Sequence, residues 1–264
     1  MRPVIALLSD FGSKDHYVGT MKAVILGICP DVTLVDITHE IAPHDVLDGA
    51  LELAAAYRFF PAGTIFLAVV DPGVGSARRG IAAEVGDYRF ISPDNGLLTA
   101  VIRDVPPRKI VELTERRYAR PTVSRTFEGR DRFAPAAAWL SKGVHLSAFG
   151  RPVTDYHLLD LPKPVLDGAT LRGAVVRIDR FGNVVTNLDR RSCERLADGG
   201  GGLQLTVRDH SIARIVSTYA DIPAGDLAAL FGSTDTLEVA AQETSAAERL
   251  GVAVGDPVEL KRNL

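Results

Sequence analysis

An aspartate and an arginine seven residues apart form the clearest pair in the sequence that could do chemistry. Asp71 follows an apolar run from Thr64 to Val70, and Arg78 comes after the Pro-Gly-Val-Gly stretch that follows Asp71. Such a run predicts a buried strand, and open α/β sheets bind their ligands beyond the carboxyl ends of the strands. A carboxylate oriented by a guanidinium could accept a proton there. The alternative is a solvated ion pair in a strand-end turn.

A second acid follows the first predicted strand. Residues Val4 to Leu8 are apolar and Asp10 lies in the turn after them. An ionised aspartate at this place can accept hydrogen bonds from both hydroxyls of a ribose. It could equally cap the helix that the apolar spacing predicts over Tyr17 to Ile28. The sequence leaves both alternatives open.

Two histidines, His39 and His44, lie close together and could suggest a metal site. Pro43 stands between them and prevents the helical i, i+4 geometry that would bring both imidazoles to one ion. Asp45 is instead placed to cap a following helix. We therefore expect no metal, and a metal-dependent hydrolase using His39, His44 and Asp71 remains an alternative.

A third group of charges lies between Arg125 and Phe133, directly before an apolar helix predicted from Ala134 to Leu140. It contains the acids Glu128 and Asp131 together with arginines, and two phenylalanines, Phe127 and Phe133, stand among these charges. Such a group could be the solvated start of the helix. The phenylalanines favour partial burial of the charges and hence a site.

The pattern of elements changes near the prolines at 162 and 164. Alternating strands and helices precede this point and predict an α/β domain over residues 1–160, with a hairpin turning at Gly86-Asp87. Short strands with turns follow and predict a small antiparallel β-barrel over residues 165–264. These strands are predicted over 173–178, 184–187, 203–207, 214–216, 237–240 and 257–260.

The composition of the chain limits the kinds of binding partner that we expect. A net charge of −3 over 264 residues gives no electrostatic reason to expect nucleic acid or an anionic membrane surface. No apolar run reaches the length of about 18 residues that suggests a membrane span. The start of the chain lacks a signal-peptide pattern, and Cys29 and Cys193 have no partner at metal-binding spacing. We therefore expect a cytoplasmic protein.

Five motifs occur in an order that extends over both predicted domains. Taken together they resemble the S-adenosylmethionine (SAM) hydroxide adenosyltransferases, which are related to the SAM-dependent chlorinase and fluorinase. The motifs are Ser9-Asp10-Phe11-Gly12, residues 70–75, residues 92–98, Phe127-Glu128-Gly129-Arg130-Asp131 and residues 179–183.

The resemblance implies a fold, an activity and an assembly. The fold is an N-terminal α/β domain with a mostly parallel central sheet and a C-terminal antiparallel β-barrel. The activity is hydrolysis of SAM to adenosine and L-methionine by a water that attacks the ribose 5′ carbon, without a cofactor. The assembly is a homotrimer, in which SAM binds between the N-terminal domain of one subunit and the C-terminal domain of its neighbour.

The resemblance also implies roles for single residues. Asp10 would bind the ribose hydroxyls, and Ser233 would meet the methionine carboxylate. Adenine would contact the backbone near Glu243. The substrate-binding turn of the second domain would be formed by Asp179, Phe181, which packs on the nucleoside, and Asn183, which hydrogen-bonds the nucleoside or the methionine.

The catalytic triad of the hydrolases contains aspartate, arginine and histidine, and positions the attacking water. Asp71 and Arg78 match its first two members. Glu128 stands where the hydrolase pattern Phe-His-Gly-Arg-Asp has histidine. Glu128 could take over the role of the histidine or be a bystander beside Arg130 or Arg132. A protein that binds SAM or adenosine without turning it over is the further alternative.

Overall fold

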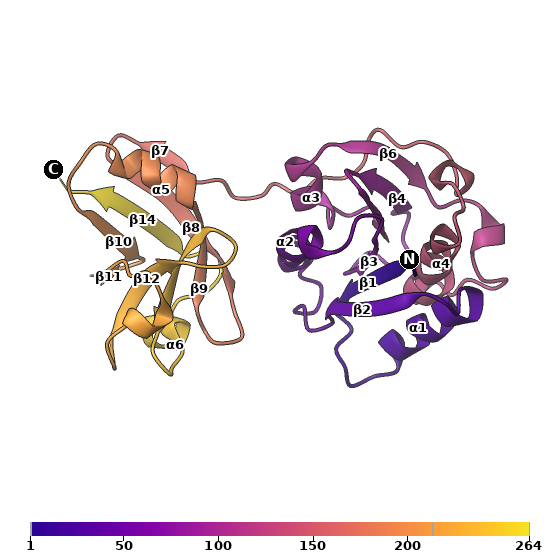
Figure 1. Cartoon of the computed structure of the whole chain (residues 1–264), viewed down its shortest axis with the longest axis horizontal. Coiled ribbons are helices and arrows are strands. Elements are labelled where there is room, and N and C mark those ends of the chain that lie inside the picture. Colours follow the sequence, from indigo (N-terminus) through magenta and orange to yellow (C-terminus); the bar gives the residue numbers. More distant parts are fainter. Residues whose placement is uncertain (1, 213, 264) are drawn as a thin grey trace. The chain divides into compact units, whose positions relative to one another are not determined.

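The computed structural model describes residues 2–212 and 214–263 and divides into two compact units (Figure 1). The first unit comprises Met1–Leu161 and the second Pro162–Leu264. Each unit has a hydrophobic core of its own, so each is described by itself.

The first unit is built on a six-stranded sheet in the order β2-β1-β3-β5-β4-β6. The first four strands in this order are parallel, and β4 and β6 run antiparallel to their neighbours. This confirms the predicted α/β class with a mostly parallel sheet. The strands are β1 (Val4–Ser9), β2 (Thr33–Thr38), β3 (Ile65–Val69), β4 (Gly80–Val85), β5 (Tyr88–Pro93) and β6 (Pro107–Glu112).

Helices cover both faces of this sheet (Figure 1). Successive strand residues point to opposite faces, so Leu7 and Leu67 pack in one apolar cluster and Leu8 and Ala68 in the other. The first cluster lies under α1 (Tyr17–Ile28) and α4 (Ala134–Ser141), and the second under α2 (Val46–Ala56) and α3 (Thr99–Asp104).

The helix caps decide two of the alternatives that the sequence left open. The Asp45 carboxylate accepts a hydrogen bond from the Asp48 N–H at 2.9 Å, which confirms the predicted cap of α2. Asp10 does not cap α1, because the N-cap residue of α1 is His16 and no side chain caps this helix. The Asp10 carboxylate instead accepts the His44 N–H at 2.9 Å.

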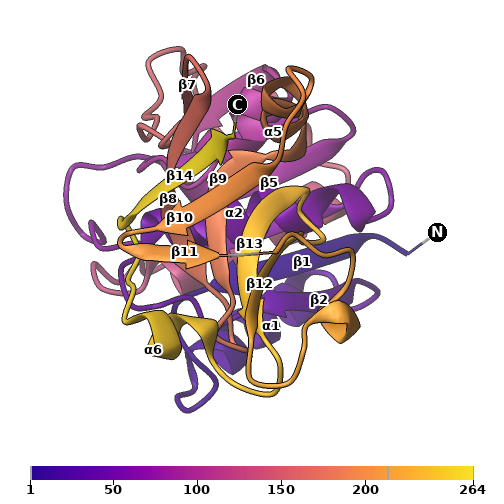
Figure 2. The same ribbon diagram turned by 90° about the vertical axis from the view of Figure 1, so that its left-hand side faces the viewer.

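The second unit is an antiparallel sheet of eight strands that curls into a nearly closed barrel, as predicted (Figure 2). Its order is β11-β10-β14-β8-β9-β13-β12, with β7 paired to β8. Two helices, α5 (Arg190–Ala197) and α6 (Ala246–Leu250), lie toward opposite ends of the sheet. The strands are β7 (Val165–Asp167), β8 (Thr170–Ile178), β9 (Val184–Asp189), β10 (Leu203–Val207), β11 (His210–Ile212), β12 (Leu227–Phe231), β13 (Thr236–Ala241) and β14 (Pro257–Arg262).

One predicted strand is wrong. Within 214–216 the chain forms only an isolated bridge between Ile215 and Ala229 rather than a strand. Helix α5 was not predicted, because its only buried apolar residues are Cys193 and Leu196, too few to establish a helical period in the sequence.

None of the helices in residues 2–212 and 214–263 combines the length and apolar character that crossing a membrane requires.

Candidate active site

Asp71, Arg78 and Glu128 come together in the first unit and form one ion-pair cluster. The Arg78 Nε donates to Asp71 Oδ1 at 2.8 Å, and its Nη2 donates to Asp71 Oδ2. The same Nη2 lies 2.5 Å from Glu128 Oε2. The side chains of the three residues are 5%, 10% and 13% exposed, respectively. The carboxylates of Asp71 and Glu128 therefore share the nearly buried guanidinium of Arg78.

Local backbone structure explains how these residues meet. Asp71 follows the end of β3, and Arg78 follows a tight turn just before β4. Gly75 in that turn has φ +77°, and a Cβ there would lie 2.4 Å from the Arg125 carbonyl oxygen. Only glycine therefore lets the turn pack against the segment that leads to Glu128.

Burial raises the pKa of the Asp71 carboxyl above its usual value, and the negative charge of Glu128 adds to this shift. The hydrogen bonds from Arg78 oppose the shift without cancelling it. Arg132 Nη2 lies 3.4 Å from Glu128 Oε1, so both oxygens of Glu128 face a guanidinium. A carboxylate whose pKa is raised accepts a proton more readily than the same group at its usual pKa.

Asp10 lies at the same edge of the sheet as this cluster. In the register of β1 and β3, Ser9 is opposite Val69, so the turns after both strands leave the sheet together. Phe11 also packs edge-on against Phe127, with ring centroids 5.9 Å apart. This contact brings the turn that carries Asp10 beside the segment that carries Glu128.

A hydrogen-bond chain that the sequence analysis missed supports the Asp10 turn. Ser9 Oγ lies 2.7 Å from His39 Nδ1, and His39 Nε2 lies 3.0 Å from Asp36 Oδ1. Lys22 Nζ pairs with Asp36 at 2.5 Å, and the Gly12 N–H donates to the His39 carbonyl at 2.7 Å. The position of His39 just after β2 was the available signal, but the sequence suggested His39 only as a metal ligand.

The metal alternative gains no support from the geometry. In the part of the chain that the structure describes, no three His, Cys, Asp or Glu side chains are grouped to hold an ion. His39 is bonded to Ser9 and Asp36, whereas the His44 N–H binds Asp10.

Two further motif residues, Asn95 and Asp131, form hydrogen bonds that hold the backbone around the cluster. Asn95 Nδ2 donates to the Val70 carbonyl at 2.8 Å and so fixes the end of β3. Asp131 is fully buried and accepts two hydrogen bonds from Arg130 at 2.7 Å and one from the Ser124 N–H at 2.9 Å. It lies in a π-helical turn, Gly129–Phe133, that directly follows Glu128.

In the second unit the predicted substrate-binding turn is organised by Asp179. Its carboxylate accepts the N–H groups of Phe181 and Asn183 at 2.9 Å and the Asn183 side-chain amide at 2.8 Å. Gly182 completes the turn with φ +81°. Asn183 is buried, whereas the side chain of Phe181 is 78% exposed.

Ser233 and Glu243 lie on other turns of the same unit. Ser233 is between β12 and β13, and Glu243, with φ +55°, follows β13. Among the described residues no hydrogen bond or ion pair joins either of them to Asp179.

Two polar residues near this turn were missed. Glu238 is buried on β13 and accepts a hydrogen bond from the Tyr219 hydroxyl. Burial raises the pKa of Glu238, and the negative charge of Asp179 raises it further. The signal in the sequence was an acid between the apolar residues of a predicted strand, at 237–240.

Comparison with known proteins identifies the family. Residues 5–150 match the SAM hydroxide adenosyltransferase N-terminal domain, and residues 173–259 match the C-terminal domain. The chain belongs to the SAM hydroxide adenosyltransferase family.

Relatives match this chain along nearly its whole length. An (R)-S-adenosyl-L-methionine hydrolase of Thermus thermophilus is 40% identical and covers 98% of this chain and 100% of its own. A protein of the same name from Salinispora tropica is 39% identical, with 96% of each chain covered. A fluorinase of Nocardia brasiliensis is 31% identical, over 98% of this chain and 97% of its own.

Solved structures agree with the fold. A crystal structure of an uncharacterized conserved protein from Thermotoga maritima has a TM-score of 0.92 at 36% identity. It covers 98% of this chain and 100% of its own. A conserved hypothetical protein from Thermus thermophilus has a TM-score of 0.79 at 38% identity, with the same coverage.

Proposed function

We propose that this SAM hydroxide adenosyltransferase hydrolyses SAM to adenosine and L-methionine, using water as the nucleophile and neither a metal nor an organic cofactor. The observation that carries the proposal is the buried Asp71–Arg78–Glu128 cluster at the ligand-binding edge of the first sheet. Relatives at 35–40% identity over almost the whole chain are named (R)-S-adenosyl-L-methionine hydrolases.

The reaction needs an aligned water and a proton acceptor. The water oxygen forms a bond to the ribose 5′ carbon, and the carbon–sulfur bond breaks with its electron pair moving to the sulfonium. Methionine leaves as a neutral thioether, and the water proton passes to Asp71. Because the sulfonium is a good leaving group, alignment of the water supplies much of the acceleration, up to about 7–11 kcal/mol.

Arg78 and Glu128 prepare Asp71 for this role. The two hydrogen bonds from Arg78 fix the plane of the Asp71 carboxylate. Glu128 contacts Nη2 of the same guanidinium and, with burial, keeps the pKa of Asp71 raised. We therefore assign proton transfer to Asp71, and positioning and tuning to Glu128.

A halide is a poor alternative nucleophile for this site. An ionised Asp71 would repel it by about 4 kcal/mol at ~4 Å and an effective dielectric constant of ~20. The ratio of 5′-chloro-5′-deoxyadenosine to adenosine formed in molar chloride measures the discrimination. A ratio far below one is expected.

The second unit supplies the remaining substrate contacts in this proposal. Phe181 offers an exposed ring for the nucleoside, with Asn183 and Ser233 as polar partners for the nucleoside and the methionine. The chain acts as a homotrimer in which the two units of one site come from different subunits. Asp10, which belongs to the first unit, binds the ribose hydroxyls of SAM.

The names of the three hydrolase relatives specify the (R) form of the sulfonium. We extend this preference to the present chain. The test is therefore made with separated (R) and (S) sulfonium epimers, incubated with purified protein in water enriched in ¹⁸O. Chromatography with mass spectrometry should show equal amounts of adenosine and methionine, faster release from the (R) epimer, and ¹⁸O in the adenosine 5′-hydroxyl.

The controls separate the alternative functions. Asp71→Asn should lower turnover by about 10²–10⁴-fold, as expected for loss of a general base. A chelator should leave the rate unchanged, and a requirement for added metal would support a metal-dependent hydrolase instead. SAM binding by calorimetry without any product would support a non-catalytic binding protein.

A further inference from the structure

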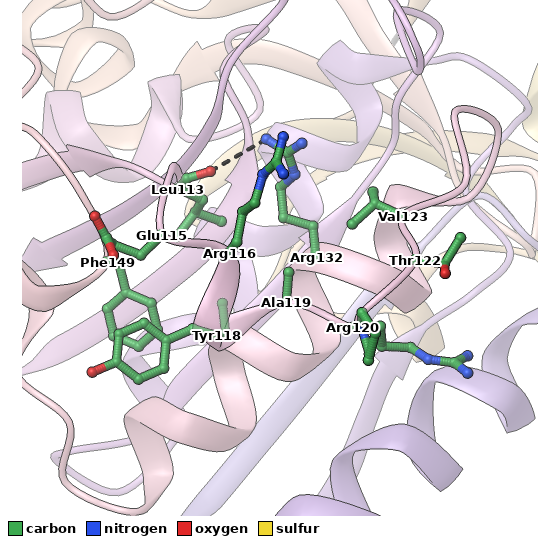
Figure 3. A pocket seen from close by; sticks show the side chains of 12 residues that line it. Leu113, Glu115, Arg116, Tyr118, Ala119, Arg120, Thr122, Val123, Arg132 and Phe149 are labelled. Atoms are coloured by element: carbon green, nitrogen blue, oxygen red, sulfur yellow. Dashed lines mark hydrogen bonds between the residues drawn. The ribbon is translucent and has the colours of Figure 1, made fainter.

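The first unit contains a pocket of about 460 Å³ in addition to the Asp71–Arg78–Glu128 cluster (Figure 3). It lies between the segment after β6 and the helical turn that carries Arg132. Its lining combines charged and aromatic side chains, chiefly Glu115, Arg116, Tyr118, Arg120, Arg132 and Phe149.

The lining has an excess of positive charge. It includes three arginines and one carboxylate, Glu115, which lies 3.8 Å from the Nε of Arg117. The charge of Arg120 is offset by Asp131, whose Oδ1 lies 3.5 Å from the Arg120 Nη1. The Arg116 guanidinium forms no hydrogen bond or ion pair with any residue in 2–212 or 214–263. Figure 3 shows the guanidinium groups of Arg116 and Arg132 at the same end of the pocket. Two like charges directed at one space favour an anion between them.

The planar arginine groups and the aromatic lining of the pocket indicate which class of anion it would bind. Arginine forks match the oxygens of a phosphate group and bind it bidentately. The half-buried ring of Tyr118 lines the pocket, with the buried Phe149 ring packed against it at a centroid distance of 4.7 Å, and it offers an apolar surface to the remainder of a ligand. A phosphate ester of the size of a sugar phosphate fits both features.

Arg132 connects this pocket with the catalytic cluster. Its Nη1 donates to the Leu113 carbonyl at 3.2 Å, and its Nη2 lies 3.4 Å from Glu128 Oε1. An anion that draws Arg132 toward the pocket leaves Glu128 with Arg78 as its remaining partner. Glu128 then competes more strongly with Asp71 for that guanidinium.

We propose that this pocket binds a small phosphate-bearing anion, and that its occupation lowers turnover through Arg132 and Glu128. The binding step stands on the pocket alone. The effect on turnover rests on the proposed SAM hydrolysis.

Binding is tested by calorimetry of the full-length protein with inorganic phosphate at constant ionic strength, set with potassium chloride. Arg116→Gln should weaken binding by about tenfold or more, the loss expected for a charge-assisted hydrogen bond. Glu115→Gln should tighten it, because that variant removes the one carboxylate of the lining. Arg108→Gln makes the same charge change outside the lining and should leave the affinity unchanged.

Equal affinities of the Arg116→Gln and Arg108→Gln variants, or no saturable phosphate binding at all, would overturn the site. Ribose 5-phosphate should bind more tightly than phosphate, and Tyr118→Ala should remove that difference. Equal binding of the two ligands to the parent protein would overturn the assignment to an ester.

The effect on turnover is measured in the same samples. Phosphate should lower kcat of the parent with little change in KM, and should have no effect on Arg116→Gln, whose basal turnover should equal that of the parent. An increase in KM alone would place phosphate in the SAM site and overturn the coupling. Calorimetry measures phosphate binding without any catalysis. The binding result would therefore still test the pocket if the protein did not hydrolyse SAM.

Discussion

Arg78 carries one positive charge that two nearly buried carboxylates share. Such an arrangement is costly for stability, because burial penalises each charge and the two acids repel each other. It is useful for catalysis for the same reason, since the acid with the raised pKa accepts a proton more readily. Burial and the neighbouring Glu128 raise the pKa of Asp71 in this way.

Glu128→Gln should shift the pH dependence of hydrolysis. Removing the negative charge of Glu128 lowers the pKa of Asp71, so Asp71 stays ionised to lower pH. The acid limb of the kcat/KM profile should therefore move to lower pH, and turnover at pH 8 should fall by no more than about tenfold.

The measurement is kcat/KM for SAM between pH 4 and pH 9, with Glu259→Gln in the second unit as the matched control. An acid limb that stays in place would show that Glu128 does not influence Asp71. A loss as large as that of Asp71→Asn would make Glu128 the proton acceptor.

At the scale of elements, side-chain hydrogen bonds join the end of β1 to the turn after β2. The chain from Ser9 through His39 to Asp36 and Lys22 links the buried end of β1 to the protein surface. Asp10 is the next residue after Ser9, so this chain fixes where its carboxylate points. The Asp10 carboxylate is held on its other side by the His44 N–H.

Two substitutions of His39 separate its hydrogen bonds. Asparagine places a polar atom near the position of Nδ1 and can keep the bond to Ser9, whereas glutamine reaches the position of Nε2 and can keep the bond to Asp36. We expect His39→Gln to raise KM for SAM by about fivefold, corresponding to one lost hydrogen bond of ~1 kcal/mol. His39→Asn should retain a KM close to that of the parent.

Both variants should have similar kcat values and similar melting temperatures in a thermal unfolding experiment. If the two variants raise KM equally, the bond from Ser9 does not position Asp10.

Asp131→Asn should destabilise the first unit. The Asp131 side chain is fully buried, and although burial itself raises its pKa, the hydrogen bonds from Arg130 and Ser124 outweigh this and lower it. Its charge therefore stabilises the fold above the ordinary pKa of 3.8, and this contribution is lost as the pH falls through the lower folded value. Loss of one partner from a buried ion pair costs about 3–5 kcal/mol, and the lower end applies here because Arg130 is partly exposed.

Urea unfolding at pH 7 and pH 3 measures this difference, with the exposed Asp160→Asn as control. The gap between Asp131→Asn and the parent should be smaller at pH 3. An equal gap at both pH values would mean that packing, not charge, accounts for the loss.

At the scale of the whole molecule, the proposed site needs two units that fold around separate cores. Asp10 and Asp71 belong to the first unit, and Phe181, Asn183 and Ser233 to the second. An exposed aromatic ring such as that of Phe181 is often a contact surface for a ligand or a partner.

A trimer with shared sites predicts complementation between inactive variants. Light scattering should give three times the chain mass of 28.3 kDa. Asp71→Asn is altered in the first unit and Asn183→Ala in the second, so mixed trimers of the two contain some sites with both units intact. Refolding them together should restore part of the activity.

Asp71→Asn refolded with Arg78→Lys is the control. Both changes lie in the first unit, and no mixed site is then intact. If the first mixture is as inactive as the control, the site is not shared between subunits.

Strongly patterned segments of this chain could be predicted from the sequence. The helix over Tyr17–Ile28 has the predicted bounds, and the buried run before Asp71 forms β3. These segments succeed because a regular apolar period is a local property that burial enforces. The strand β12 was missed because its Leu-Ala-Ala-Leu-Phe run does not alternate, and α5 was missed because it buries few apolar residues.

The ordered motifs in the sequence also identified the family and named the candidate residues. Only the tertiary structure decides which of them meet. Glu128 is fifty residues from Arg78, Ser9 is thirty from His39, and Tyr219 is nineteen from Glu238. Such contacts depend on how strands and turns pack together, which no local pattern encodes. For the same reason the raised pKa of Asp71 belongs to the folded chain, because burial and a distant carboxylate produce it.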